Sequence, residues 1–266
     1  MSKLAISNIA WPETKDSFFL DQICKLGLSD IEVSPFRLSS DKNFKAVFKL
    51  NDIAGAKNIN IVALQALMYR HPELQLFKDS GARQKLNHHL ISLIDLAVSL
   101  NAKVLVFGAP KNKVLGRLNH HQALMVAVEF FQQISKYAEQ KSITFCIEPT
   151  PSIYGAEFIT NSEEALKLIE LVNSRAFKLN FDIGSALSNH ENIKQIIDSH
   201  IAQIGHVHIS EPDLSPIMLD KSRHMSISNA LKRNRYEGFA SVEMLAPKNN
   251  PEATVIDVLT FLKDIY

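Results

Sequence analysis

Apolar runs of strand length alternate with helix-like stretches along this whole chain, and that alternation constrains the fold more than any other feature. Apolar residues at helical spacing on one face of 83–100 show the pattern clearly. We expect strands at 4–9, 31–33, 59–64, 104–107, 143–147, 177–181, 204–209 and 239–244, helices at 15–26, 43–57, 83–100, 120–140, 161–172, 192–200, 227–233 and 253–265, and an irregular stretch at 210–223. Eight such units without a break in composition predict an α/β protein in which residues 1–266 form one (β/α)8 barrel, the TIM-barrel fold.

The length agrees with this prediction, because 266 residues is close to the ~250 typical of such a barrel. The main alternative is an open doubly wound sheet, which usually has a glycine-rich turn after its first strand. Here the segment from Ser7 to Trp11 follows the first strand and contains no glycine, and the chain has only nine glycines. The closed barrel is therefore favoured over the open sheet.

Charge and composition restrict the partners. The 29 Lys and Arg residues nearly balance 28 Asp and Glu residues, for a net charge of +1, so neither a nucleic acid nor a membrane partner is expected. No apolar run has the length that spans a bilayer, and the first residues lack a signal-peptide layout. Only two cysteines occur, as is usual in a reducing compartment. We expect a cytoplasmic protein.

Four polar side chains stand at the ends of the last four predicted strands. They are Glu148, Asp182, His208 and Glu243, separated in turn by 34, 26 and 35 residues. Each interval accommodates one strand, one helix and two loops. The carboxyl ends of parallel barrel strands converge on one mouth, and three carboxylates brought together there need a cation to neutralise them. The pattern predicts a site for a hard divalent metal ion.

This arrangement resembles the xylose isomerase-like barrels, and its spacing is most similar to that of sugar epimerases of the tagatose/psicose 3-epimerase type. The resemblance extends over nearly the whole chain. It implies that Glu148, Asp182, His208 and Glu243 are the ligands of one metal ion, and that the two glutamates flank the reacting substrate carbon. The metal ion would be Mn²⁺, with Mg²⁺ or Co²⁺ as alternatives. Barrels of this kind often pair, so a homodimer stays open.

The function predicted on this basis is an isomerase or epimerase of a sugar or sugar phosphate. Such an enzyme removes a proton from a carbon next to a carbonyl group, passing through an enediolate that the metal stabilises. Glu148 and Glu243 would then be the catalytic residues that accept and donate the proton. Carbohydrate is the expected substrate.

The sequence departs from the epimerase pattern at two places. Ser185 stands where the family often has a histidine, and Leu214 where the epimerases usually have an arginine. These departures keep a non-catalytic sugar-binding barrel open as an alternative. A metal-dependent dehydratase of a keto-inositol or cyclic acid is a second alternative, because such enzymes resemble the same barrels. The related three-zinc endonucleases have extra histidines after strands three and four, where this chain has Gln65 and Gly108. A nuclease is therefore the least favoured reading.

Several further residues are candidates for contact with the substrate because they follow predicted strands. Lys111 could bind a phosphate or carboxylate, or be a solvated loop cation. Glu32 could bind a sugar hydroxyl, or form an ion pair on the barrel floor. His206, two residues before His208, is expected deeper in the barrel. The complete set of substrate-binding candidates is Glu32, Gln65, Lys111, Tyr154, Ser185, Glu211 and His224.

Overall fold

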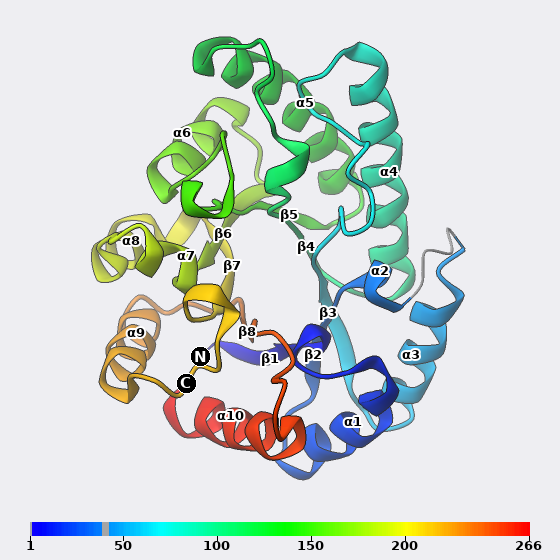
Figure 1. The fold of residues 1–266 in the computed structure, drawn as a ribbon, viewed down its shortest axis with the longest axis vertical. Coiled ribbons are helices and arrows are strands. Elements are labelled where there is room, and N and C mark those ends of the chain that lie inside the picture. The colour runs from blue at the N-terminus through cyan, green and yellow to red at the C-terminus, as the bar shows by residue number, and fades with distance from the viewer. Residues whose placement is uncertain (1, 39–42) are drawn as a thin grey trace.

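The structure is a computed structural model that describes residues 2–38 and 43–266. Within these residues eight parallel strands pair in chain order, and the barrel closes where β8 pairs with β1 (Figure 1). The strands are β1 (Lys3–Ser7), β2 (Asp30–Val33), β3 (Asn60–Leu64), β4 (Val104–Phe107), β5 (Thr144–Ile147), β6 (Phe177–Asp182), β7 (Ile204–Ile209) and β8 (Phe239–Val242). The predicted TIM barrel is confirmed.

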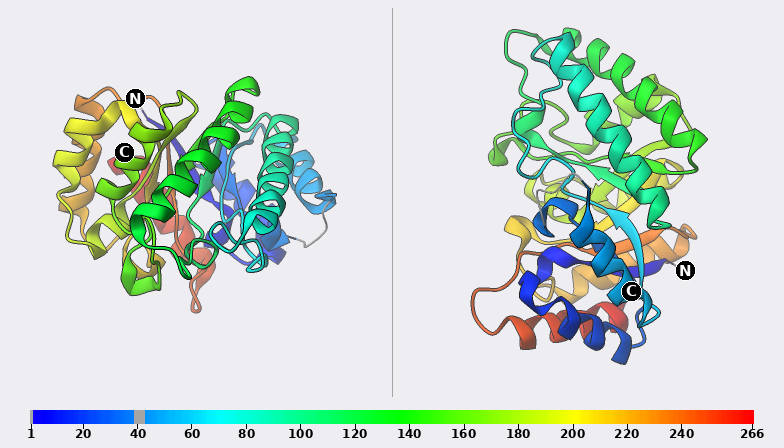
Figure 2. Two further views of the ribbon diagram at one scale, coloured as in Figure 1. Left: turned by 90° about the horizontal axis from the view of Figure 1, so that it is seen from above. Right: turned by 90° about the vertical axis from the view of Figure 1, so that its right-hand side faces the viewer.

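Helices surround the barrel on the outside, as the views in Figures 1 and 2 show from different directions. They are α1 (Asp16–Lys25), α2 (Pro35–Leu38), α3 (Lys45–Gly55), α4 (Ser80–Ser99), α5 (His120–Gln140), α6 (Ser162–Val172), α7 (Ile183–Ser188), α8 (Ile193–His200), α9 (Lys221–Arg233) and α10 (Pro251–Ile265). No helix within residues 2–38 and 43–266 is long and apolar enough to cross a membrane.

Several helices begin at a residue whose side chain accepts a hydrogen bond from a backbone N–H of the first helical turn. The Asp79 carboxylate accepts from the backbone N–H of Ala82 at the start of α4, and Asn119 forms a reciprocal capping box with Gln122 in α5. Asp220 caps α9 in the same way. That cap starts α9 six residues before the predicted residue 227, so the prediction that all of 210–223 is irregular was wrong. The short helices α2 and α7 were not predicted either.

The strands separate two apolar layers. On β4, Leu105 and Phe107 belong to the large core between the barrel and the helices. Val104 and Val106 belong to a smaller cluster, and because side chains alternate along a strand, this cluster fills the inside of the barrel. On β7 the inward positions are instead taken by His206 and His208, which are completely buried. Two imidazole side chains thus lie inside the barrel.

Candidate metal centre

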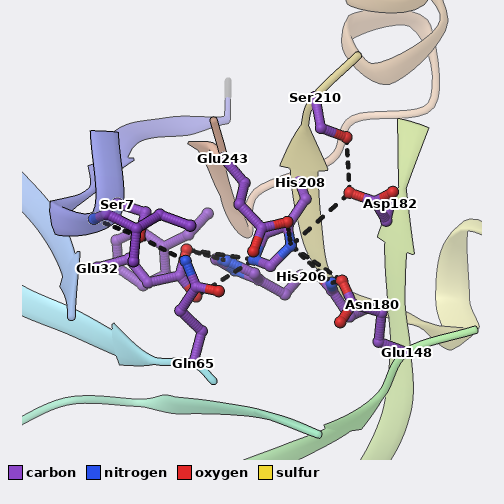
Figure 3. A network of polar contacts seen from close by, with 12 residues as sticks. Ser7, Glu32, Gln65, Glu148, Asn180, Asp182, His206, His208, Ser210 and Glu243 are labelled. Atoms are coloured by element: carbon purple, nitrogen blue, oxygen red, sulfur yellow. Dashed lines mark hydrogen bonds and ion pairs between the residues drawn. The ribbon is translucent and has the colours of Figure 1, made fainter. Parts of the chain in front are cut away.

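The four residues at the strand ends meet in space. Asp182 is the last residue of β6 and pairs in register with His208 of β7, while Glu148 and Glu243 directly follow β5 and β8. Each of the four offers one ligand atom, and these atoms all lie within 4.8 Å of one another. Figure 3 shows Glu243 and Glu148 approaching the His208 ring from different sides. The structure therefore brings together all four residues that the spacing singled out.

Three carboxylates surround one nitrogen of the imidazole. His208 Nδ1 lies 3.0 Å from Glu243 Oε2, 3.1 Å from Glu148 Oε1 and 3.8 Å from Asp182 Oδ2. Burial raises the pKa of Asp182, and the nearby charge of Glu148 adds to that effect. Burial likewise raises the pKa of Glu243. The carboxylates are thus difficult to ionise together unless a positive charge lies between them.

His208 is the positive charge that the residues themselves supply. Burial opposes protonation of its ring, but the carboxylates of Glu243 and Glu32 outweigh burial and raise the pKa of His208 well above its ordinary value. A divalent cation at the same place would neutralise the carboxylates more completely than one proton does. The donor set of three carboxylates and one imidazole is the kind that holds a hard divalent cation, and the residues fit such an ion.

The other nitrogen of His208 is held from behind. His208 Nε2 lies 3.3 Å from Glu32 Oε1 and 3.2 Å from Oε2, and Glu32 is completely buried. An ionised carboxylate only accepts hydrogen bonds, so Nε2 carries a hydrogen, and a cation that replaced the proton on Nδ1 would meet the lone pair of that nitrogen among the three acids. A carboxylate that orients a histidine in this way is common behind metal-binding histidines.

The charge of Glu32 is stabilised in return. Burial alone would raise the pKa of Glu32, but the charges of His208 and His206 oppose burial and leave the pKa well below its ordinary value. His206 Nε2 lies 3.4 Å from Glu32 Oε2. Of the two predicted roles for Glu32, the structure favours the buried ion pair, because its carboxylate has no exposed surface from which to meet a sugar.

Neighbouring polar groups orient the carboxylates. Asn180 Nδ2 donates to Glu148 Oε1 at 2.9 Å. Ser210 Oγ donates to Asp182 Oδ2 at 2.6 Å, and the backbone N–H of Ser185 donates to Asp182 Oδ1 at 2.5 Å, which makes Asp182 the cap of α7. The role of Asn180 was not predicted from the sequence. Its signal was a polar residue two positions before Asp182, on the same face of the strand.

Gly108 at the end of β4 makes room for Glu148. A Cβ atom at residue 108 would overlap Glu148 Oε2. The glycine is therefore needed for the close approach of the carboxylate to the backbone, not for an unusual backbone angle.

A cavity of about 380 Å³ opens beside the four residues. Three predicted substrate-binding residues, Tyr154, Ser185 and Glu211, lie on its walls. The complete lining is Gly108, Ala109, Pro110, Glu148, Pro149, Thr150, Tyr154, Asp182, Gly184, Ser185, Glu211, Pro212, Asp213, Leu214 and Glu243.

The structure places two other candidates away from this cavity. Gln65 is buried and donates to Ser7 Oγ. His224 is buried behind Glu211: its Nε2 lies 3.1 Å from Glu211 Oε1, and its Nδ1 lies 2.7 Å from the Tyr266 hydroxyl. Neither side chain lines the cavity. Each makes its hydrogen bonds within the protein.

Lys111 is also displaced from the predicted place. It is exposed and lines a different hollow, on the β3 side of Ala109 and Pro110. The lysine beside the site is Lys113, which is completely buried and whose Nζ lies 3.4 Å from the carbonyl oxygen of Glu148. Burial lowers the pKa of Lys113 to about 8, against the opposing charges of Glu148 and Glu164.

The family model for the xylose isomerase-like TIM barrel matches residues 21–265. The chain belongs to this family. No protein with curated annotation matches the sequence significantly. The family resemblance predicted from the strand-end residues is confirmed.

Several solved structures are similar to this chain in fold. D-psicose 3-epimerase with D-tagatose from Clostridium cellulolyticum H10 is 16% identical, with a TM-score of 0.83 over 99% of both chains. The 3-keto-D-glucoside 4-epimerase YcjR from E. coli is 14% identical, with a TM-score of 0.82 over 99% of this chain and 100% of that one. An AP endonuclease of family 2 from Brucella melitensis is 16% identical, with a TM-score of 0.80 over 96% and 97%. Such low identities show the fold alone, and only the site's own chemistry can distinguish the activities.

Proposed function

We propose that this member of the xylose isomerase-like barrels is a divalent-metal-dependent carbohydrate isomerase or epimerase. The observation that carries the proposal is the convergence of Glu148, Asp182, His208 and Glu243 on one point beside a cavity. Similar structures include two epimerases that act on sugars. A cytoplasmic location and a homodimer remain predictions from the sequence.

The four residues divide into two pairs by exposure. The side chains of Glu148 and Glu243 are 17% and 12% exposed, against 5% for Asp182 and 0% for His208. The two glutamates line the cavity and approach from β5 and β8, so they can reach a substrate from different sides. They suit the acceptor and donor of a proton on a carbon next to a carbonyl.

A bound divalent cation would supply the electrostatic stabilisation of negative charge on the substrate oxygens when that proton leaves. The protein's own part is to hold the donor atoms in place. Glu32 keeps Nδ1 of His208 pointing at the acids, and Ser210 and the amide of Ser185 fix Asp182. We propose Mn²⁺ as the ion, with Mg²⁺ and Co²⁺ as alternatives.

The test is exchange of a carbon-bound hydrogen. Mn²⁺-loaded protein is incubated in D₂O with ketoses, ketose phosphates and keto-inositols, and NMR and mass spectrometry report deuterium uptake, epimer formation and loss of water. We expect uptake at one carbon, with Glu148→Gln and Glu243→Gln each slowing it by at least ~100-fold. Glu139→Gln, on the exposed face of α5, is the matched control and should keep the wild-type rate.

Three outcomes would contradict the proposal. Unchanged turnover in both site variants would remove the glutamates from the chemistry. Loss of water from the product would show a dehydratase. Binding without exchange in any compound would show a sugar-binding barrel.

A further inference from the structure

The cavity beside the metal centre carries no cationic side chain among its described lining residues. The charged residues on its walls are all acids: Glu148, Asp182, Glu211, Asp213 and Glu243. Phosphate and carboxylate groups are normally bound by arginine or lysine side chains or by free backbone amides. The question is therefore whether a cation or a free amide can reach the cavity from nearby.

The neighbouring cations are engaged elsewhere. Arg223 Nη2 lies 2.7 Å from Glu211 Oε2, and its Nη1 lies 3.6 Å from Asp220 Oδ2. Lys113 is buried against the Glu148 carbonyl, and Lys111 lies at a different hollow. None of these three side chains lines the cavity.

Four backbone amides on the cavity wall are also engaged. The N–H of Gly184 donates to Ser210 Oγ at 2.8 Å, and that of Ser185 to Asp182. The N–H of Asp213 donates to the Tyr154 hydroxyl at 3.1 Å, and that of Leu214 to the Glu211 carbonyl at 3.0 Å. These four amides are therefore not free to bind an anion.

The rest of the cavity lining is largely apolar. Its apolar side chains are those of Ala109, Pro110, Pro149, Tyr154, Pro212 and Leu214, and its uncharged polar ones are those of Thr150 and Ser185. Such a surface packs against C–H groups and cannot compensate the loss of water from a charged group.

We infer that the substrate is an uncharged carbohydrate whose end remote from the reacting carbon lies against this apolar wall, and that sugar phosphates and sugar acids are excluded. The inference rests on the proposed function for the reacting end and deepens it by naming the substrate class. With a divalent cation bound, the three carboxylates of the centre still exceed its charge by one, and Asp213 adds another negative charge. An anionic substrate would meet repulsion without a compensating ion pair.

The experiment uses matched triplets of ketohexoses: the free sugar, its 6-deoxy analogue and its 6-phosphate. Deuterium exchange and calorimetric binding are both measured on the Mn²⁺-loaded protein. We expect the free sugar of the preferred ketohexose to exceed its phosphate at least ~10-fold in exchange rate and in affinity, because no cationic side chain lines the described part of the cavity. The 6-deoxy analogue should match the free sugar in exchange rate and in affinity.

A designed cation provides the reverse test. Leu214→Lys places an ammonium on the cavity wall and should raise binding of the phosphate relative to the free sugar by roughly tenfold. Leu219→Lys is the matched control, because Leu219 belongs to the same loop between β7 and α9, is 73% exposed and does not line the cavity. It should leave the ratio unchanged.

The outcomes separate this inference from the proposed function. Exchange that is as fast with the phosphate as with the free sugar overturns the inference and leaves the proposed function intact. Selective binding of the free sugar without exchange supports the inference while the proposed function fails. A large loss on removing the 6-hydroxyl, or no binding by any member, overturns the inference.

Discussion

The carboxylate behind His208 provides the sharpest test of the metal centre. Replacing Glu32 with glutamine keeps its size and leaves one oxygen that can still accept from His208 Nε2. It removes the negative charge that lies 3.2–3.3 Å from that nitrogen. The ring should then lose part of its orientation and basicity at Nδ1, the atom that faces the acids.

Loss of such a supporting carboxylate typically weakens metal binding about 10- to 100-fold. That range corresponds to ~1.4 to ~2.7 kcal/mol of binding free energy. Both contacts of His208 with Glu32 are buried, so solvent does not reduce the effect. We therefore expect Glu32→Gln to fall within this range, and His208→Gln to lose at least as much because it removes the nitrogen itself.

The assay is calorimetric titration of metal-free protein with Mn²⁺, with thermal unfolding as the check that each variant folds. Glu252→Gln is the control, since Glu252 forms an exposed surface pair with Lys15 at 3.1 Å and should bind metal like the wild type. Wild-type affinity in Glu32→Gln, together with loss of binding in His208→Gln, would refute the supporting role of Glu32. Wild-type affinity in both would refute the metal centre itself.

Three further predictions concern the bound metal, Gly108 and the start of α6. A chelator should lower the melting temperature of purified metal-loaded protein, and Mn²⁺ at 100 times its Kd should add ~2.7 kcal/mol to the free energy of unfolding in calorimetry. Gly108→Ala should weaken Mn²⁺ binding roughly tenfold because the new Cβ overlaps Glu148 Oε2; an unchanged affinity would show that Glu148 can move at no cost. Asn161→Ala removes the side chain that accepts from the Glu164 amide at the start of α6 and should cost ~1 kcal/mol in denaturant unfolding, without affecting metal binding.

The strand ends were predictable because two local rules coincide there. Apolar runs mark the strands, and parallel barrel strands end at one mouth, so a polar residue at the end of a run must lie near the others. This reasoning placed Glu148, Asp182, His208 and Glu243 together without any knowledge of contacts. The start of α9 was misplaced because Asp220 caps it within a polar stretch, where periodicity carries little signal.

The direction of side chains in the loops was not predictable in the same way. Lys111 and Lys113 are two residues apart after β4, yet one is exposed and the other is buried beneath Glu148. The single turn of 3₁₀ helix at Pro110–Asn112 decides which of them points inward. His224 likewise meets Glu211 and Tyr266 only through the packing of α9 and the chain end.

The sequence by itself determined the order of strands and helices, the closed barrel, and the three acids and one imidazole at its mouth, because periodicity and strand ends are local properties of the chain. Only the tertiary structure decided that Glu32 lies behind His208, and that no lysine or arginine of residues 2–38 and 43–266 lines the cavity. These features depend on where side chains from distant strands and irregular loops point, and no spacing along the chain records that direction.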